Sequence, residues 1–453
     1  MNINDELQVN IEKLSNLGFG IAKVDGFVIF VENACPEDTV KIRLTKITKN
    51  YANAKIVEII SPSPYRVEPF CPMQKVCGAC QLQFIDYEYQ IKLKQGIVQD
   101  AMRTIAQLDI DVPSPIPSPQ TKEYRHKIQY PISETKVSKR LLAGYYKPQS
   151  HEIVNIKYCP IQPKICDEII DYIRNHAFDY GISGFNEKKH TGDLRHVVIR
   201  TSVATGKNLV VLVVNATKSF DRLKDFAQSI YEAFEEVSGV CVNFNSKKTN
   251  VIMGQVSECI CGRDFIKERI LEKTFRIGAN TFFQVNPKSA ENIFRYVRDY
   301  IQGTFTEPLV LDAYAGVTSF GICVSDVCKK VVSVEENKNS TDLAREIITA
   351  NGIDNIEVHN MDAGKFFAKE KRKFDAVILD PPRKGCTAQS LDEAVRLCKG
   401  KIIYVSCNPA TLARDLKYLT AKGCKVESVQ PFDMFCHTYH IENVAIVDVK
   451  KGI

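Results

Sequence analysis

The chain has 453 residues, of which 44% are hydrophobic and 25% are charged, a balance that excludes an intrinsically disordered protein. No run approaches the ~18 continuous apolar residues of a membrane-spanning helix, and residues 1–10 lack a secretory pattern. We therefore expect a cytoplasmic protein with no membrane partner. The net charge of +6 permits a nucleic-acid partner without requiring one. At ~150 residues per domain, the length suggests roughly two to four domains, and we expect three.

Residues 1–62 are predicted to form a small OB-like β-barrel. Several short, evenly spaced strands are typical of such barrels, which often bind oligonucleotides, although a purely structural cap is the alternative. Prolines 62 and 64 end the last strand, because proline cannot continue a strand ladder. The apolar runs that predict the strands lie at 7–11, 18–22, 27–31, 40–44 and 54–60.

A strand-rich segment that also contains helical stretches occupies the middle of the chain. Residues 86–108, which precede it, show helical spacing, and prolines between 113 and 119 predict a stiff, extended linker. We expect a central α+β domain, interrupted once, and a last domain that takes up the remainder. The expected bounds are 63–90 and 125–262 for the central domain, and 91–124 and 263–453 for the last.

From about residue 309 the pattern changes to buried strand, turn, helix and buried strand. This alternation predicts a parallel, Rossmann-like α/β sheet with helices on both faces. Ligands of such sheets bind at the carboxyl ends of the strands, where the conspicuous polar residues of this segment lie. The predicted strands are 308–312, 330–335, 355–360, 374–380, 401–406 and 444–449.

Three strand ends predict a site for a cofactor that contains a nucleoside. The first strand runs into Asp312-Ala-Tyr-Ala-Gly316, whose small residues let the backbone approach a ligand closely. Glu335 ends the second strand, where a carboxylate can accept the ribose hydroxyls, and Asp362 follows the third, near an adenine. NAD is the alternative, but the first turn lacks the G-x-G-x-x-G fingerprint. Asp380, followed by two prolines, further favours a methyl donor.

Cys407 and Glu442 are the predicted catalytic pair. Cys407 follows the fifth strand, beside the expected cofactor site. Carbon 5 of uracil is a poor nucleophile, but addition of a thiolate at carbon 6 makes it enolate-like and able to take a methyl group. The proton on carbon 5 must then be removed, and Glu442 is the candidate base. A lone cysteine is usually a small core residue, so the prediction depends on the combination with Asp380.

Residues from about 278 to the C-terminus resemble the RNA uracil-5 methyltransferases, which are class I enzymes dependent on S-adenosylmethionine. The resemblance lies in Thr-Phe-Phe-Gln-Val-Asn at 281–286, the turn at 312–316, Asp-Pro-Pro-Arg at 380–383, Ser-Cys-Asn-Pro at 406–409 and His-Ile-Glu at 440–442. It implies Cys407 as nucleophile and Glu442 as base. It also implies four residues that hold or line the cofactor site: Gln284, Tyr314, Glu335 and Asp380. One departure is Ala315, where a cysteine is expected.

Four cysteines predict a metal centre. The chain has 16 cysteines, and a large cytosolic protein keeps its thiols reduced, so clustered thiols indicate metal binding or catalysis. Spacing alone leaves zinc and an iron–sulfur cluster equally open. The family's subgroup that methylates 23S ribosomal RNA carries a TRAM barrel with the same spacing, and the resemblance implies a 4Fe-4S cluster held by Cys71, Cys77, Cys80 and Cys159. A radical adenosylmethionine enzyme is disfavoured, because it needs C-x3-C-x2-C where this chain has C-x5-C-x2-C.

A uridine in structured RNA must be unstacked before its carbon 5 can react. We expect basic and aromatic side chains near 124–127, 144–147 and 194–196 to hold the flanking nucleotides. The resemblance implies 23S ribosomal RNA as the substrate, and we expect a monomer that needs no protein partner. The alternatives are the same reaction on transfer RNA and a non-catalytic iron–sulfur protein that binds RNA.

Overall fold

The computed structural model describes residues 1–135 and 140–449. No helix in these residues is long and apolar enough to cross a membrane. The chain forms two compact units, and each is considered by itself. The first comprises Met1–Gln74, Cys80–Ser118 and Phe367–Ile453, and the second comprises Lys75–Ala79 and Pro119–Phe366.

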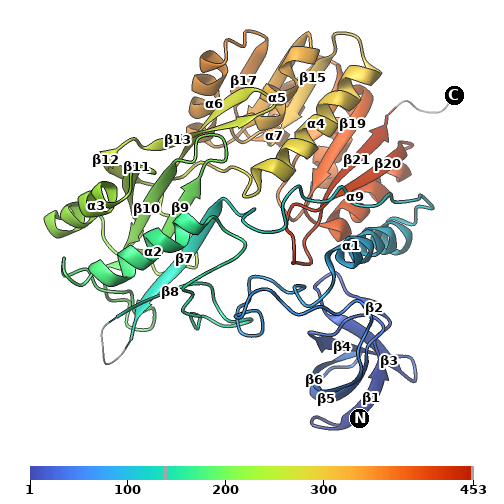
Figure 1. The fold of residues 1–453 in the computed structure, drawn as a ribbon. Helices are drawn as coiled ribbons and strands as arrows, with labels where there is room; N and C mark the ends of the chain where they lie inside the picture. The colour runs from blue at the N-terminus through green and yellow to red at the C-terminus, as the bar shows by residue number, and fades with distance from the viewer. Residues whose placement is uncertain (136–139, 450–453) are drawn as a thin grey trace. The chain divides into compact units, whose positions relative to one another are not determined.

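The N-terminal part of the first unit is a six-stranded sheet in the order β1-β5-β6-β4-β3-β2 (Figure 1). The pairing of β5 with β6 contains register shifts, which are typical of β-bulges. An extra residue in one strand of a pair bends that strand, so these shifts curve the sheet. The inner face buries alternate residues such as Ile29, Val31, Ile42 and Leu44. The strands are β1 (Glu6–Asn10), β2 (Lys13–Leu14), β3 (Gly20–Val24), β4 (Phe27–Glu32), β5 (Thr39–Ile47) and β6 (Tyr51–Ser61).

Helix α1 (Tyr87–Ala101) and a π-helical turn (Met102–Ala106) follow, within the predicted helical segment. Asp86 caps α1 by accepting the Tyr89 N–H at 3.1 Å. Lys94, fully buried on this helix, forms an ion pair with the equally buried Asp433 at 2.6 Å. Removing either partner of a buried ion pair is strongly destabilising, because it leaves the other charge buried and unpaired. The contact therefore holds in place the segment around Asp433, which leads to the last strand.

The C-terminal part of the first unit has four strands in the order β18-β19-β21-β20. Strands β18 and β19 are parallel, whereas β21 runs antiparallel to both of its neighbours. Strand β20 is absent from the sequence prediction. The elements are β18 (Phe374–Leu379), α8 (Ala388–Leu397), β19 (Cys398–Ser406), α9 (Pro409–Ala421), β20 (Lys425–Phe432) and β21 (Glu442–Asp448).

The second unit contains a mixed sheet in the order β12-β11-β10-β9-β7-β8. Strand β10 is buried along its whole length, as its unbroken apolar run predicts. Helix α3 connects the parallel strands β10 and β11. The elements are β7 (Lys127–Glu134), β8 (Leu141–Ala143), α2 (Lys164–His176), β9 (Leu194–Thr201), β10 (Asn208–Val214), α3 (Asp221–Ala233), β11 (Val237–Phe244) and β12 (Ser257–Gly262).

A hairpin and three parallel strands complete the second unit. The strand order β17-β16-β15 and the intervening helices match the predicted alternation, and each observed strand begins and ends within one residue of its prediction. The elements are β13 (Phe265–Ile270), β14 (Lys273–Gly278), α4 (Pro287–Thr304), β15 (Leu309–Ala313), α5 (Ser319–Val324), a short 3-10 helix (Ser325–Val327), β16 (Lys330–Glu335), α6 (Lys338–Ala350) and β17 (Ile356–Asn360). Helix α7 (Ala363–Lys369) begins in this unit and ends in the first.

Candidate active site

Cys407 lies between the end of a buried strand and the start of a helix. Strand β19 ends at Ser406, and Asn408 caps α9 by accepting the Ala410 N–H at 3.0 Å. The Ser406 hydroxyl accepts the Asn408 N–H at 3.2 Å, which tightens the turn on both sides of the cysteine. The thiol is therefore held on a rigid turn, half-buried, at the carboxyl end of the sheet.

Glu442 lies beside Cys407 because of strand register. Ser406 pairs with Asn443 in the antiparallel β19–β21 ladder, so the next pair outward is Cys407 and Glu442. The Asn443 side-chain amide donates to the Ser406 carbonyl at 3.1 Å and reinforces this pairing. Glu442 is the first residue of β21 and only 8% exposed. A carboxyl group and a thiol are thus held next to each other, as the sequence analysis proposed for a base and a nucleophile.

Asp380 is a second carboxyl group near Glu442. Burial raises the pKa of Asp380 to about 7, far above its ordinary 3.8. Burial, and then repulsion from Asp380, raises the pKa of Glu442 to about 8. At neutral pH most Glu442 side chains are therefore protonated. When ionised, Glu442 is a stronger base than an ordinary carboxylate, which suits removal of a carbon-bound proton.

Arg383 is a site residue that the sequence analysis quoted within its motif but assigned no role. Burial raises the pKa of the Cys407 thiol, and the Glu442 charge raises it further. The positive charge of the Arg383 guanidinium, which lies close to the thiol, acts in the opposite direction and lowers this pKa. The sequence could have suggested a role for Arg383, because it is the charged residue that directly follows the two prolines after Asp380.

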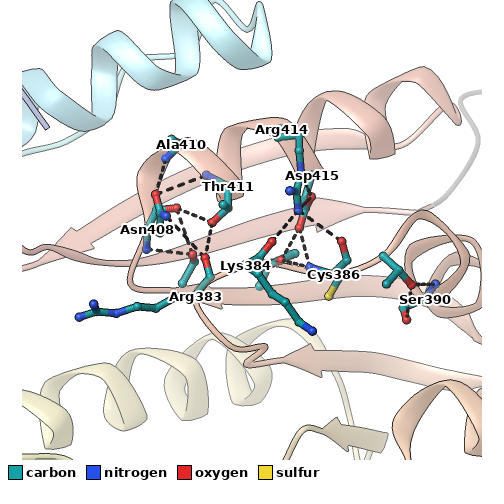
Figure 2. Close-up of polar contacts among 12 residues, drawn as sticks. Arg383, Lys384, Cys386, Ser390, Asn408, Ala410, Thr411, Arg414 and Asp415 are labelled. Atoms are coloured by element: carbon teal, nitrogen blue, oxygen red, sulfur yellow. Dashed lines mark hydrogen bonds and ion pairs between the residues drawn. The ribbon is translucent and has the colours of Figure 1, made fainter. Parts of the chain in front are cut away.

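Figure 2 shows how the start of α9 holds the backbone of Arg383. The Arg383 carbonyl accepts the Thr411 hydroxyl at 3.2 Å and the Asn408 side-chain amide at 3.5 Å. Both donors belong to the turn that follows Cys407, so the residue that binds the thiol is fixed to the segment that carries the thiol.

The predicted cofactor turn lies in the second unit, after β15. Tyr314 has a left-handed backbone with a φ of 62°, which turns the chain sharply after the strand. Glu335, at the end of β16, accepts the Gly316 N–H at 3.0 Å and the Asn337 N–H at 2.8 Å. These bonds orient the Glu335 carboxylate and leave lone pairs for a ligand hydroxyl. The structure therefore joins Glu335 to the turn that carries Tyr314.

Asp362 and Gln284 also belong to the second unit. The backbone N–H of Met361 donates to the Glu335 carbonyl at 2.9 Å, which places exposed Asp362 just beyond Glu335. Gln284 precedes α4 and lines a cavity of about 10 Å³ together with Lys127 and Arg200. Tyr314, Glu335 and Asp362 thus lie at the ends of neighbouring strands as predicted, whereas Gln284 lies in the loop before α4 and lines a separate cavity.

Comparison with known proteins was made for the whole chain. A family model described as tRNA (Uracil-5-)-methyltransferase matches residues 245–450, and a TRAM domain model matches residues 2–57. An uncharacterized RNA methyltransferase from Halalkalibacterium halodurans is 36% identical over 456 residues, covering 100% of this chain and 98% of that protein. Another from Gloeobacter violaceus is 37% identical over 443 residues, covering 97% of this chain and 96% of that protein. The chain belongs to the RNA (uracil-5-)-methyltransferase family.

A solved structure supports the same family assignment over the full length. It is the Pyrococcus abyssi tRNA (uracil-54, C5)-methyltransferase in complex with S-adenosyl-L-homocysteine, which is 27% identical with a TM-score of 0.79. The match covers 97% of this chain and 100% of that one. The predicted fold class is confirmed: an α/β methyltransferase fold with an N-terminal TRAM domain.

The four cysteines predicted to bind a cluster are divided between the two units: Cys71 and Cys80 belong to the first, and Cys77 and Cys159 to the second. Within residues 1–135 and 140–449, no group of three or more Cys, His, Asp or Glu side chains is placed to hold a metal ion. The Cys71 N–H donates to the Gln83 side chain and the Cys159 N–H to Asp167, both at 3.2 Å. Cysteine thiolates are the usual ligands of iron–sulfur clusters, and no catalytic step is derived through one here.

The predicted RNA-contacting segments of this methyltransferase differ in exposure. Tyr124 is 1% exposed and Arg195 is 5% exposed, and Arg195 donates to the backbone carbonyls of Lys247 at 2.8 Å and Thr249 at 3.3 Å. These two side chains are parts of the core and hold loops together. Tyr146 and Lys147 are partly exposed and line an open cleft of about 480 Å³. Of the three segments, 144–147 is the one whose aromatic and basic side chains both reach the surface.

Proposed function

We propose that this enzyme methylates carbon 5 of a uridine through a covalent bond between Cys407 and carbon 6 of the base. The observation that carries the proposal is the pairing of Ser406 with Asn443, which sets Cys407 beside Glu442. The contact of Arg383 with the thiol supports it, since a guanidinium favours the thiolate that must attack.

The proposed reaction has balanced steps. The Cys407 thiolate adds to carbon 6, and the electron pair of the 5,6 double bond moves to carbon 5 and the carbonyl oxygen. S-adenosylmethionine, when bound, supplies a methyl group on a sulfonium, which carbon 5 takes with loss of S-adenosylhomocysteine. The Glu442 carboxylate then removes the proton from carbon 5, the double bond re-forms, and the bond between sulfur and carbon 6 breaks. Cys407 leaves as the thiolate with which the cycle began.

Residues of the second unit are proposed to hold the methyl donor. Glu335 is oriented by two backbone N–H groups, which suits it to accept ribose hydroxyls. Tyr314, Asp362 and Gln284 are the other proposed contacts, and the resemblance also implies a cofactor role for Asp380. Calorimetric titration of the adenosylmethionine analogue sinefungin into Glu335→Gln and the wild type tests the assignment. Wild-type affinity in the variant would contradict it.

The proposed substrate is 23S ribosomal RNA, on the basis of the resemblance to the subgroup that combines a TRAM barrel with this cysteine spacing. Transfer RNA is a second candidate because of a specific observation. The Pyrococcus abyssi enzyme, which acts on transfer RNA by its description, matches this chain over 97% of its length, barrel included. A barrel is therefore no argument against transfer RNA.

Mass spectrometry of separated RNA fractions distinguishes the two substrates. Ribosomal and transfer RNA from a strain that lacks the gene would be digested and assayed for 5-methyluridine. Loss from the 23S fraction, restored by the wild-type gene and not by Cys407→Ala, supports the first proposal. Loss from transfer RNA alone supports the second candidate. Unchanged 5-methyluridine in both fractions would contradict methylation of either RNA.

We also propose that Cys71, Cys77, Cys80 and Cys159 bind a 4Fe-4S cluster when iron is supplied, on the basis of their spacing and the resemblance. Anaerobic purification followed by assay of iron and acid-labile sulfide tests this. Serine at any of the four should lower both, whereas Cys259→Ser, at an exposed thiol, should change neither. Zinc without sulfide would contradict the proposal.

We also propose the domain bounds predicted from the sequence, which are 1–62 for the first domain, 63–90 with 125–262 for the central domain, and 91–124 with 263–453 for the last.

A further inference from the structure

The 380–386 loop connects β18 to the turn before α8 and carries both Asp380 and Arg383. Its backbone turns tightly, since the Gly385 N–H donates to the Pro382 carbonyl at 2.8 Å. Gly385 adopts a φ of +76°, in the left-handed region that favours glycine. The loop is therefore a rigid structure, and what holds it determines where Arg383 lies.

Arg414, on the second turn of α9, binds the carbonyls of this loop. Its guanidinium donates to the Lys384 carbonyl at 2.9 Å and to the Cys386 carbonyl at 3.3 Å. Thr411 and Asn408 bind the Arg383 carbonyl, so three side chains from the cap and the first two turns of α9 hold the loop (Figure 2). The loop and the start of α9 thus behave as one body.

Asp415 lies at the centre of these contacts and is only 2% exposed. Its carboxylate accepts the Cys386 N–H at 2.9 Å, the Tyr404 hydroxyl at 2.6 Å and the Arg414 Nε at 2.8 Å. A buried carboxylate is costly unless it is paired and hydrogen-bonded, and this one satisfies a loop donor, a strand hydroxyl and a helix cation at once.

Gly385 shows how closely the loop is held. A Cβ atom at this position would lie 2.5 Å from the Asp415 carboxylate and 2.6 Å from the Arg414 guanidinium. No side chain fits there without displacing the charged pair. The close approach therefore requires glycine in the loop and a carboxylate on the helix, in matching positions.

We propose that Asp415 is a positioning residue of the methylation reaction, which acts by holding the 380–386 loop so that the Arg383 guanidinium meets the Cys407 sulfur. The inference rests on the proposed function. Cys407 lies two residues before the first residue of α9, and Arg383 lies in the loop that Asp415 ties to α9. One carboxylate thus fixes both partners of the contact. Asp415 is eight residues from the nucleophile in sequence and acts only through other residues.

The test compares Asp415→Asn with the wild-type enzyme by the pH dependence of Cys407 alkylation. Iodoacetamide labelling of the peptide that contains Cys407, followed by mass spectrometry, needs neither RNA nor methyl donor. The charged groups that face this thiol are Glu442 on β21 and Asp380 and Arg383 on the loop. If Arg383 is no longer held near the thiol, only the two carboxylates act on it, and both disfavour the thiolate. The pH at which alkylation of Cys407 is half-maximal, its midpoint, should then rise by about half a pH unit to one pH unit, and labelling at neutral pH should fall roughly three- to ten-fold.

Tyr404→Phe removes a single hydroxyl from the same network and should shift the midpoint in the same direction by less. Asp392→Asn is the matched control, because Asp392 also accepts a tyrosine hydroxyl, that of Tyr418 at 2.9 Å, and pairs with Lys422, away from the loop. It should leave the midpoint unchanged. Thermal unfolding of each variant is recorded alongside.

The proposal is overturned if Asp415→Asn folds and keeps the wild-type midpoint. It is also overturned if only the alkylation rate at high pH changes, because that rate reports access of the reagent to the thiol and not its pKa. If Asp415→Asn does not fold, Tyr404→Phe decides, and an unshifted midpoint in that variant overturns the proposal. Failure of the proposed function is separate. It would appear as wild-type protein that forms no adduct with RNA, whatever the alkylation profile.

Discussion

Cys407 and Glu442, 35 positions apart in the sequence, are neighbours because Ser406 pairs with Asn443 across β19 and β21. The two strands are antiparallel, so the end of one meets the start of the other. This register, together with the buried Lys94–Asp433 pair that holds the segment before β21, determines the distance between the proposed nucleophile and the proposed base.

Glu442→Gln should stop turnover after methyl transfer. Glutamine keeps the size of the side chain but cannot remove the proton from carbon 5, so the RNA should stay bonded to Cys407. Turnover should fall by at least ~10²-fold. Denaturing gels with unmodified substrate RNA should then show a slowly migrating adduct that the wild type does not accumulate. Rapid turnover without an adduct would exclude Glu442 as the base.

The same substitution should change the pH dependence of stability. Burial raises the pKa of Glu442 from 4.5 to about 8, so the folded state keeps a proton that the unfolded state releases. This contribution is fully present below pH 4.5 and is lost as the pH rises through about 8. The melting temperature of Glu442→Gln relative to wild type should therefore increase across this window and level off above it. A constant difference would show that Glu442 titrates normally.

Arg383→Met should raise the pKa of Cys407, because it removes the cation that opposes burial and Glu442. We expect methylation at neutral pH to fall by about ten-fold and to recover partly as the pH is raised. Arg383→Lys, which retains the charge, should show a smaller loss. Lys384→Met removes a neighbouring exposed cation and is the control. Equal losses in Arg383→Met and Lys384→Met would indicate a general effect on RNA binding.

Gly321→Ala, in α5, should disturb the preceding turn, which we propose holds the cofactor. A Cβ atom there would lie 2.7 Å from the Thr318 side chain and 2.8 Å from the Ser333 hydroxyl. The cost should be about 1–3 kcal/mol of stability, with weaker binding of adenosylmethionine measured by calorimetry. Gly303→Ala, in α4 with open space around it, should instead stabilise by about 0.5–1 kcal/mol. Wild-type binding by Gly321→Ala would show that the turn adapts freely.

Local patterns predicted much of this fold. The parallel strands that precede Tyr314, Glu335 and Cys407 follow from short apolar runs with polar ends, and β16 was predicted with the bounds observed. Strand β20 was missed, because its edge position exposes several residues and weakens the apolar signal. The barrel has a sixth strand, β2, which is only two residues long and too short to give a pattern.

Pairing between distant segments could not be predicted in the same way. The sequence analysis chose Cys407 and Glu442 by motif, but their contact depends on the β19–β21 register, which no local pattern specifies. Arg383 and Asp415 had no assigned role because their importance comes from what they touch. Tyr124 and Arg195 were predicted to contact RNA because of their residue types, but both side chains are buried in the core.

The proposed reaction requires the Cys407 sulfur to bond to carbon 6 of the target uridine. Incubation of the enzyme with adenosylmethionine and substrate RNA that contains 5-fluorouridine tests it directly, because fluorine cannot leave as the proton does. We expect a denaturation-resistant complex of protein and RNA that maps to the Cys407 peptide and is absent from Cys407→Ala. Methyl transfer to normal RNA by Cys407→Ala, or a wild-type enzyme that methylates normal RNA but forms no such complex, would contradict it.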